Sequence, residues 1–363
     1  MTPRIPIAAL AAGALALGAA ACGSSSNDNN SSSGGGSTAS GTVNGAGSTF
    51  AAPVYQQWGA DLKGDGMTVN YQAVGSGAGV AALASGTAAY AGSDPALAPE
   101  DRATFKKGDV VQIPMFFGAI TVSYNQSGVP KDLKLDGKTV ADIFLGKVKK
   151  WNDPAIAKLN SGTSLPDASI TIVHRSDESG TTKGFTTFLS DVSSEWKSKV
   201  GADKTVKWPT GTGAKGNDGV AAAIKQTDGS IGYVEQAYAL QNDFTYADIK
   251  NSSGKFIAPT LDSTSAAGDG VKVPADLGIS TINAPGATAY PIASQTFVDV
   301  YKDPCKAGVS EGDAKALKGF IEYGLGQGQA TLDKLFFAKL PSDLLAKSKS
   351  AAGTLTCNGS PMA

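Results

Sequence analysis

Residues 170–189 read ITIVHRSDESGTTKGFTTFL, and this stretch combines a strand pattern with a helix pattern. Residues 170–173 predict a β-strand, and Phe185, Phe188 and Leu189 recur at the i, i+3, i+4 spacing of one helix face. The residues between them are polar or glycine. The stretch therefore predicts a strand, a polar turn and a helix in immediate succession.

The same succession recurs along the chain. Further strands are predicted at residues 67–71, 110–114, 119–122 and 231–234. Further helices are predicted after the turn at residues 45–50, where Val54 and Trp58 lie on one face, and at residues 80–84, 140–144 and 220–224. Strands that alternate with helices predict an α/β fold with largely parallel pairing. The 363 residues are enough for about two domains.

Three polar turns share one chemistry. They lie at residues 45–50, 75–79 and 175–181, each before a predicted helix, and each contains glycine together with Ser or Thr. A helix N-terminus leaves backbone N–H groups unpaired and carries the positive end of the dipole, so it can bind an anion. Arg175 adds a planar fork that matches phosphate or carboxylate. The alternative for each turn is an ordinary helix cap, for which Ser and Thr are preferred.

Charge and histidine content exclude several classes of protein. Lys and Arg number 31 and Asp and Glu 32, so the chain lacks the basic excess of a nucleic-acid-binding protein. The single histidine, His174, cannot build a zinc site of several imidazoles. As the base of a hydrolase it would have to serve Ser76 or Ser179, but the chain has no G-x-S-x-G motif.

Nucleotide-binding motifs are absent or out of context. No G-x-x-x-x-G-K-[ST] loop occurs, so nothing in the sequence would hold ATP. Residues 211–216 match G-x-G-x-x-G, but no clear strand precedes them. We therefore interpret this segment as a loop before the helix predicted at residues 220–224.

The N-terminus predicts export and a lipid anchor. Arg4 precedes an apolar run of about 17 residues, which is short for a permanent membrane span and typical of a signal peptide, here residues 1–21. Small residues directly before Cys22 resemble a bacterial lipoprotein cleavage site and make Cys22 the predicted lipidation site. Ordinary signal-peptide cleavage is the alternative. Residues 22–42, rich in Gly, Ser and Asn, predict a flexible tether.

Two cysteines remain in the exported chain, Cys305 and Cys357. A remaining pair in an exported protein favours a disulfide, and two free thiols are the alternative. Their distance in the sequence excludes a redox C-x-x-C motif.

Eight motifs in order closely resemble the phosphate-binding proteins of ABC-type phosphate importers. The resemblance covers residues 43–340, and its motifs are Gly45–Tyr55, Tyr71–Gly77, Ala91–Pro95, Leu135–Thr139, Lys149–Asp153, Arg175–Thr181, Lys215–Gly219 and Ile231–Glu235.

This resemblance implies a type II periplasmic-binding-protein fold. Two α/β lobes, joined by two hinge strands, close on the ligand in the cleft between them. Residues 43–118 plus 288–363 would form lobe one, and residues 119–287 lobe two. The chain would be an exported monomer and not an enzyme, lipid-anchored to the membrane and facing the periplasm or extracellular space. It would pass inorganic phosphate to membrane permease subunits that a separate ATPase drives.

The resemblance also implies a binding site that uses hydrogen bonds alone, without metal or cofactor. The matching phosphate-binding positions are Thr49, Phe50, Ser76, Asp94, Arg175, Ser179, Gly180 and Thr181. Asp177 matches a residue that supports the arginine. The departures from the family pattern are Ser48, Gly77, Ala78, His174 and Glu178.

Three alternative functions remain open at the level of the sequence. The same fold could bind another oxyanion, such as sulfate or molybdate, or the chain could be a secreted phosphohydrolase, or a sensor or adhesin that has lost transport. Asp94 separates the oxyanions, because an ionised carboxylate only accepts hydrogen bonds. Phosphate has a proton to donate at neutral pH, and sulfate has none.

We predict that Cys22→Ser releases the protein from the membrane fraction. Serine cannot form the thioether that carries the lipid, so detergent partitioning of the two proteins measures the anchor directly. A Cys22→Ser chain that still enters the detergent phase would contradict the predicted anchor.

Overall fold

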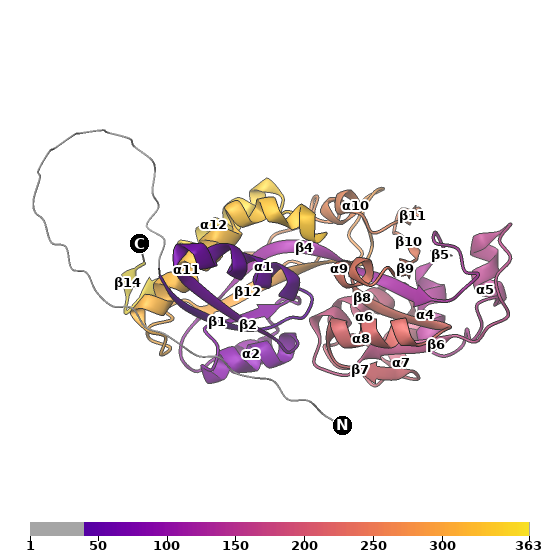
Figure 1. Cartoon of the computed structure of the whole chain (residues 1–363), viewed down its shortest axis with the longest axis horizontal. Coiled ribbons are helices and arrows are strands. Elements are labelled where there is room, and N and C mark those ends of the chain that lie inside the picture. Colours follow the sequence, from indigo (N-terminus) through magenta and orange to yellow (C-terminus); the bar gives the residue numbers. More distant parts are fainter. Residues whose placement is uncertain (1–39, 363) are drawn as a thin grey trace, which may run out of the picture. The chain divides into compact units, whose positions relative to one another are not determined.

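The computed structural model describes residues 40–362, which form an α/β structure built on one large mixed sheet (Figure 1). The α/β class predicted from the sequence is therefore confirmed. The predicted signal peptide at residues 1–21 and the predicted lipidation site Cys22 lie outside the described residues. Of the predicted tether, only residues 40–42 are described, and the first strand already begins at Gly41.

The large sheet contains nine strands of the described chain. In spatial order they are β2 (Met67–Ala73), β1 (Gly41–Gly47), β3 (Tyr90–Ser93), β12 (Ala293–Tyr301), β4 (Val110–Asn125), β8 (Ser230–Glu235), β6 (Thr171–Arg175) and β7 (Thr212–Ala214), with β9 (Thr245–Tyr246) paired to β4. Strand β1 is parallel to β2 and β3, and β6 is parallel to β7 and β8.

The predicted largely parallel pairing is wrong for the centre of the sheet. Strand β12 runs antiparallel to β3 and β4, and β4 runs antiparallel to β8. The sequence did not predict β12, because Gln295 and Asp299 interrupt its apolar pattern although every residue of the strand is buried.

Strand β4 connects two groups of strands. Residues 110–119 pair with β12, and residues 120–125 pair with β8. We call β1, β2, β3, β12 and residues 110–119 the first group, and β6 to β9 with residues 120–125 the second group. Figure 1 shows β4 running from one group to the other. The two strands predicted at residues 110–114 and 119–122 are thus one strand, in which a bulge accommodates Pro114.

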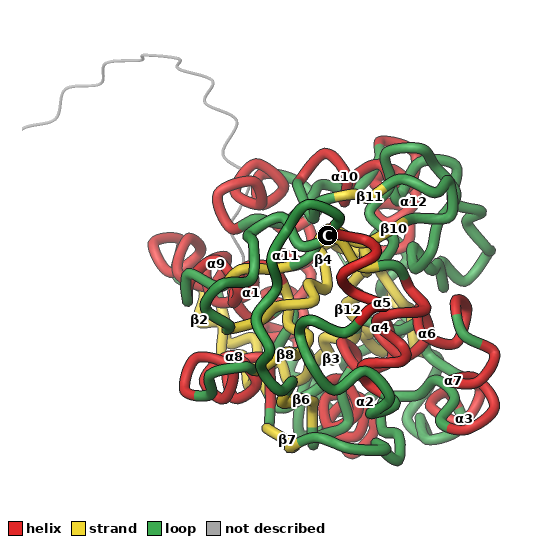
Figure 2. The backbone as a smooth tube through the Cα atoms, turned by 90° about the vertical axis from the view of Figure 1, so that its right-hand side faces the viewer, coloured by secondary structure: helices red, strands yellow, loops and turns green. Residues whose placement is uncertain are grey.

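Helices lie around the strands (Figure 2). Their bounds are α1 (Ala52–Leu62), α2 (Ser76–Ser85), α3 (Pro99–Arg102), α4 (Gly137–Phe144), α5 (Pro154–Ala157), α6 (Gly180–Val192), α7 (Ser194–Lys199), α8 (Gly216–Gln226), α9 (Gln236–Gln241), α10 (Leu261–Ala266), α11 (Glu311–Gly324) and α12 (Ser342–Ala352), with 3₁₀ turns at Lys63–Asp65, Lys158–Asn160 and Gln327–Leu335. The predicted helices at 80–84, 140–144, 185–189 and 220–224 are confirmed. No helix within residues 40–362 is long and apolar enough to cross a membrane.

Aromatic side chains fill the core of each group. In the first group, Tyr55 and Trp58 of α1 contact Phe116 and Phe320 edge to face. In the second group, Phe185 of α6 stacks on a buried tyrosine of β8, with ring centroids 4.3 Å apart. These contacts bury the apolar faces that the helical spacing predicted and fix each helix against its sheet.

The segment at residues 211–216 is not the simple loop that the sequence predicted. Residues 212–214 form β7, which pairs in parallel with β6, and α8 begins at Gly216. A strand of three residues carries too little periodicity to be seen in the sequence. Its pairing places the start of α8 beside the end of β6.

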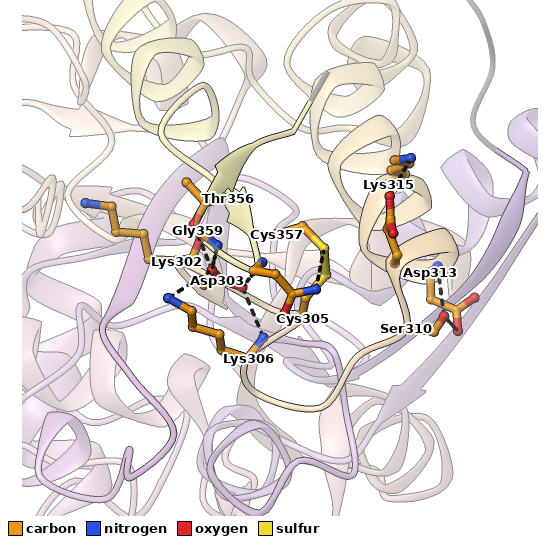
Figure 3. Close-up of a disulfide and its surroundings, with 12 residues drawn as sticks. Lys302, Asp303, Cys305, Lys306, Ser310, Asp313, Lys315, Thr356, Cys357 and Gly359 are labelled. Atoms are coloured by element: carbon orange, nitrogen blue, oxygen red, sulfur yellow. Dashed lines mark hydrogen bonds and ion pairs between the residues drawn. A yellow bond between two sulfur atoms is a disulfide. The ribbon is translucent and has the colours of Figure 1, made fainter.

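Two small sheets complete the described chain. One contains β11 (Phe256–Ile257), β10 (Asp248–Lys250) and β5 (Lys134–Leu135), and the other contains β13 (Thr356–Cys357) and β14 (Ser360–Pro361). A disulfide joins Cys305 and Cys357 (Figure 3). Their Cα atoms lie 5.0 Å apart. The carboxylate of Asp303 accepts hydrogen bonds from the backbone of Lys306 and Gly359, so it also joins the two segments.

We predict that replacing both cysteines by alanine lowers the free energy of unfolding by up to about 4 kcal/mol. The disulfide spans 52 positions, and a loop of that length has this effect in the chain-entropy model. Denaturant titration of both proteins, with and without reductant, measures the change. Reductant should shift only the wild-type protein, and an unchanged wild-type midpoint would contradict the prediction.

Candidate functional site

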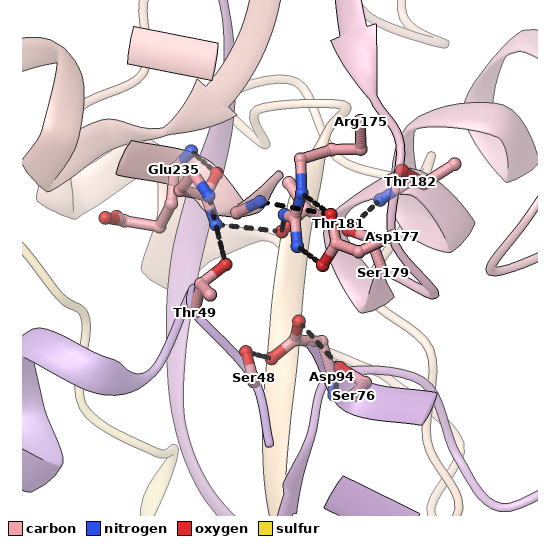
Figure 4. Close-up of polar contacts among 12 residues, drawn as sticks. Ser48, Thr49, Ser76, Asp94, Arg175, Asp177, Ser179, Thr181, Thr182 and Glu235 are labelled. Carbon is pink, nitrogen blue, oxygen red and sulfur yellow. Dashed lines mark hydrogen bonds and ion pairs between the residues drawn. The ribbon is translucent and has the colours of Figure 1, made fainter. Parts of the chain in front are cut away.

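The three polar turns predicted from the sequence meet in one place (Figure 4). They follow β1, β2 and β6, whose carboxyl ends carry them. The approach is close: a Cβ atom added to Gly180 would lie 2.4 Å from Ser76 Oγ and 2.4 Å from Asp94 Oδ2. Gly180 therefore has no room for a side chain. The first turn of α6 lies against Ser76 and Asp94, which follow strands of the first group.

Arg175 is buried at the end of β6 and is held by Asp177. Its Nε and Nη2 atoms donate to the two carboxylate oxygens of Asp177 at 2.7 and 2.5 Å, and its Nη1 atom donates to Thr181 Oγ1 at 3.3 Å. A guanidinium has five N–H groups, so two remain for a ligand. Burial alone would raise the pKa of Asp177, but hydrogen bonds from Arg175 and its charge outweigh burial and hold that pKa below its usual value.

Asp94 follows β3 and is 1% exposed. Its Oδ1 atom accepts hydrogen bonds from Ser48 Oγ at 2.6 Å and Thr296 Oγ1 at 3.0 Å, whereas Oδ2 has only a long contact of 3.4 Å with Ser76 Oγ. Burial raises the pKa of Asp94 to about 6, although these hydroxyl groups and the charge of Arg175 oppose the shift. Oδ2 therefore keeps a lone pair with which to accept a further proton.

Hydroxyl and backbone donors surround these two charged groups. Ser179 caps α6, since its Oγ accepts from the backbone N–H of Thr182 at 3.0 Å, and its own proton remains available. Residues Gly180 and Thr181 precede the first α6 backbone hydrogen bond, so the helix leaves their N–H groups to other partners. Phe50 ends the first polar turn, directly before the N-cap residue of α1, and its ring is buried against Phe337.

Asn217, which the sequence did not single out, lies in the centre of this network. Its side-chain amide donates to Thr49 Oγ1 at 2.9 Å and to Thr181 Oγ1 at 3.2 Å. The residue belongs to the Lys215–Gly219 motif, and that motif was the only signal that could have marked it. Ser48 and Thr296, the two donors to Asp94, were likewise not predicted as site residues.

His174 and Glu178 lie at the edge of the site. The His174 ring stacks on Trp208 with centroids 4.7 Å apart, and its Nδ1 is 3.0 Å from the carbonyl oxygen of Arg175. Partial burial lowers the pKa of His174. Neither of these interactions joins the ring to Ser76 or Ser179. They therefore give no support to a hydrolase in which His174 acts as the base of one of these serines. Glu178 is exposed, and its carbonyl oxygen accepts from Gly77 N at 3.1 Å.

Acidic and thiol groups within residues 40–362 form no cluster of three or more that could hold a metal ion. The donors described above instead suit an anion, because a guanidinium, hydroxyl groups and a helix N-terminus all present hydrogen atoms.

We predict that stability falls between pH 4 and pH 7 more steeply in the wild type than in Asp94→Asn. The Asp94 carboxyl loses its proton near pH 6 when folded and near pH 3.8 when unfolded, so the folded protein binds more protons between these values. Relative to Asp94→Asn, the free energy of unfolding of the wild type should therefore decrease by about 2 kcal/mol from pH 4 to pH 7, at about 1.4 kcal/mol per pKa unit.

Denaturant titration of both proteins from pH 4 to pH 7 gives the comparison. Asp299 also has a pKa raised by burial, but it is present in both proteins and cancels in the difference. The pKa of Glu235 is raised by burial and also by the charge of Asp94, so Asp94→Asn lowers it and adds to the difference in the same direction. Identical pH profiles would contradict the prediction.

Known proteins share this sequence pattern and fold. A family model described as a PBP superfamily domain matches residues 32–327. The phosphate-binding protein PstS of Pasteurella multocida is 41% identical over 314 residues, covering 85% of this chain and 89% of the relative. PstS of Xylella fastidiosa (strain 9a5c) is 40% identical over 312 residues, covering 85% and 84%.

Solved structures give the same result for the fold. A high-affinity periplasmic phosphate-binding protein (PfluDING) bound with phosphate superposes with a TM-score of 0.70 at 22% identity, covering 85% of this chain and 93% of the other. A phosphate-binding protein from Stenotrophomonas maltophilia gives 0.68 at 19%, covering 89% and 99%. The periplasmic-binding-protein fold implied by the resemblance is confirmed, and the chain belongs to the PBP superfamily and, within it, to the family of PstS phosphate-binding proteins.

Proposed function

We propose that this protein captures inorganic phosphate outside the cytoplasm and delivers it to an ABC-type permease. It is a binding protein and not an enzyme. The observation that carries the proposal is that one site contains both Arg175, which keeps two free N–H groups, and Asp94, whose Oδ2 keeps a free lone pair. Phosphate is an anion that also carries a proton, and it matches both groups.

The donors of the site would hold the phosphate oxygens. The guanidinium of Arg175 supplies charge-assisted hydrogen bonds, which are stronger than neutral ones. Uncharged donors come from both groups of strands, namely the hydroxyl groups of Thr49, Ser76, Ser179 and Thr181 and the backbone N–H groups of Phe50, Gly180 and Thr181. Such a set replaces the water that a desolvated anion loses.

Asp94 would select phosphate over sulfate. An ionised carboxylate accepts the phosphate proton, but it offers sulfate only repulsion in a site without water. The selection thus works by a penalty against the wrong ligand. If this site instead bound sulfate or molybdate, the buried Asp94 carboxylate would have no favourable interaction with the ligand.

The two groups of strands would act as two lobes that close on the ligand. Residues 43–118 plus 288–363 form lobe one and residues 119–287 lobe two in this proposal. The chain would pass between the lobes twice, near residue 119 and near residue 288. At the first passage, β4 changes its pairing partner from β12 to β8 after residue 119. The second passage lies beside the first, since Ile120 N donates to Ile292 O at 2.9 Å. Residues 273–277 line a cavity together with residues of α12 and β4, and Asp276 accepts a hydrogen bond from Arg102 at 3.0 Å, so this part of lobe two would move with lobe one.

Contacts outside the site would hold the lobes together when closed. Lys204 Nζ lies 2.7 Å from Asp101 Oδ1, and both side chains are largely buried. The backbone carbonyl of Lys204 also accepts from Ser179 N at 3.0 Å, so this lysine connects lobe one to the first turn of α6.

Delivery requires partners that the chain itself does not contain. We propose that the exported protein is a monomer, held to the membrane through Cys22, and that it docks on permease subunits driven by a separate ATPase. The segment between Cys22 and the start of β1 would connect the anchor to the two lobes.

We predict that Asp94→Asn reduces discrimination against sulfate. The amide keeps the shape, removes the charge and adds donors, so sulfate loses its penalty while phosphate loses one acceptor. Sites that pair a ligand hydroxyl reject an analogue without it by about 10⁴-fold or more, so the ratio of the two affinities has room to fall by orders of magnitude. Calorimetric titration with phosphate and with sulfate at pH 8, well above the pKa of Asp94, gives the ratio.

Asp299→Asn is the matched control for this experiment. Asp299 is also a fully buried carboxyl with a raised pKa, but it lies on β12 without contact to the predicted site residues. Its substitution should leave the ratio unchanged. An equal phosphate-to-sulfate ratio in the wild type and Asp94→Asn would refute the role of Asp94, and wild-type protein that does not bind phosphate would refute the proposed function.

A further inference from the structure

Asn217 is fully buried in the first turn of α8, and all its side-chain hydrogen bonds are defined. Its Oδ1 atom accepts from the backbone N–H of Glu235 at 3.0 Å. Because a backbone N–H can only donate, this bond fixes which end of the amide is oxygen. The NH₂ group must then face the two threonines, Thr49 and Thr181.

The two threonine hydroxyls have no acceptor capacity left. A hydroxyl group accepts two hydrogen bonds and donates one. Thr49 Oγ1 accepts from the backbone N and from Nδ2 of Asn217, at 3.2 and 2.9 Å. Thr181 Oγ1 accepts from Asn217 Nδ2 at 3.2 Å and from Arg175 Nη1 at 3.3 Å. Each hydroxyl is therefore left with its proton to donate.

Thr187 of α6 shows what a hydroxyl does without such partners. Its Oγ1 donates its proton back to the carbonyl oxygen of Lys183 at 2.7 Å. This bond to the preceding turn is the usual choice of Thr in a helix. Thr181 is the second residue of the same helix, so no helical turn precedes it. Because it also accepts two bonds on Oγ1, its proton remains free to point away from the network.

We propose that Asn217 is a positioning residue that orients the hydroxyl protons of Thr49 and Thr181 toward the bound anion. The inference rests on the proposed function, because the orientation matters only if an anion binds between these hydroxyls. Asn217 touches no ligand itself and acts through the two threonines. Thr49 follows β1 and Asn217 lies in the first turn of α8, so the amide also makes the orientation of Thr49 depend on closure of the two groups.

A double-mutant cycle tests this role. Asn217→Leu removes the donors at similar volume, and phosphate affinity should fall by about tenfold or more, because two hydrogen bonds to a charged ligand lose their orientation. In a background with Thr49→Val and Thr181→Val, the same substitution should cost less than about threefold, since no hydroxyl is left to orient. Asn217→Ala serves as the second variant if the leucine variant does not fold.

A merely structural role gives a different result. If Asn217 only stabilises the fold, its substitution weakens phosphate binding equally in both backgrounds, and the proposal is wrong. Asn251→Leu is the matched control, because Asn251 is a buried amide whose Nδ2 donates to Gly286 O at 2.9 Å, away from the site. It should lower the unfolding midpoint without changing phosphate affinity. Wild-type protein without phosphate binding would instead overturn the proposed function.

Discussion

A charge taken out of water must keep hydrogen bonds, and this constraint governs the whole site. Arg175 and Asp94 are both nearly inaccessible to solvent, and neither is paired with the other. Arg175 is satisfied by Asp177, which uses both carboxylate oxygens. Asp94 is satisfied by hydroxyl groups, which donate without adding charge. Each charged group therefore stays buried and hydrogen-bonded, while two N–H groups of Arg175 and a lone pair of Asp94 remain free. An anion that carries a proton fits these free groups.

The topology brings these groups together from distant parts of the chain. Parallel strands end at the same edge of a sheet, so the turns after β1, β2 and β3 supply one set of polar groups, and the turn after β6 supplies another. Strand β4 joins the two sets because it pairs with β12 along one half and with β8 along the other. A binding site made of two such sets is complete only when both are in contact, which couples ligand binding to the arrangement of the strand groups.

Local patterns predicted the local parts of this structure. The helical spacing in α6 and the polar turn before it were visible in the sequence, as were Arg175 and its partner two residues later. The single long strand β4 was not predicted, because Pro114 interrupts the pattern and its pairing partners lie far away in the sequence. Asn217 and Thr296 were missed for the same reason: their partners Thr49 and Asp94 are 168 and 202 positions distant. Their roles come from tertiary contacts, which no short motif encodes.

Neutron diffraction from deuterated crystals grown with phosphate would test the account most directly, because it locates the protons on which the site depends. The proposed site predicts a phosphate between Arg175 and Asp94, with a phosphate deuteron aimed at Asp94 Oδ2. It also predicts that the hydroxyl deuterons of Thr49 and Thr181 point at the anion. A phosphate bound elsewhere, or a site in which the only deuteron between anion and Asp94 belongs to the carboxyl group at pH 8, would contradict it.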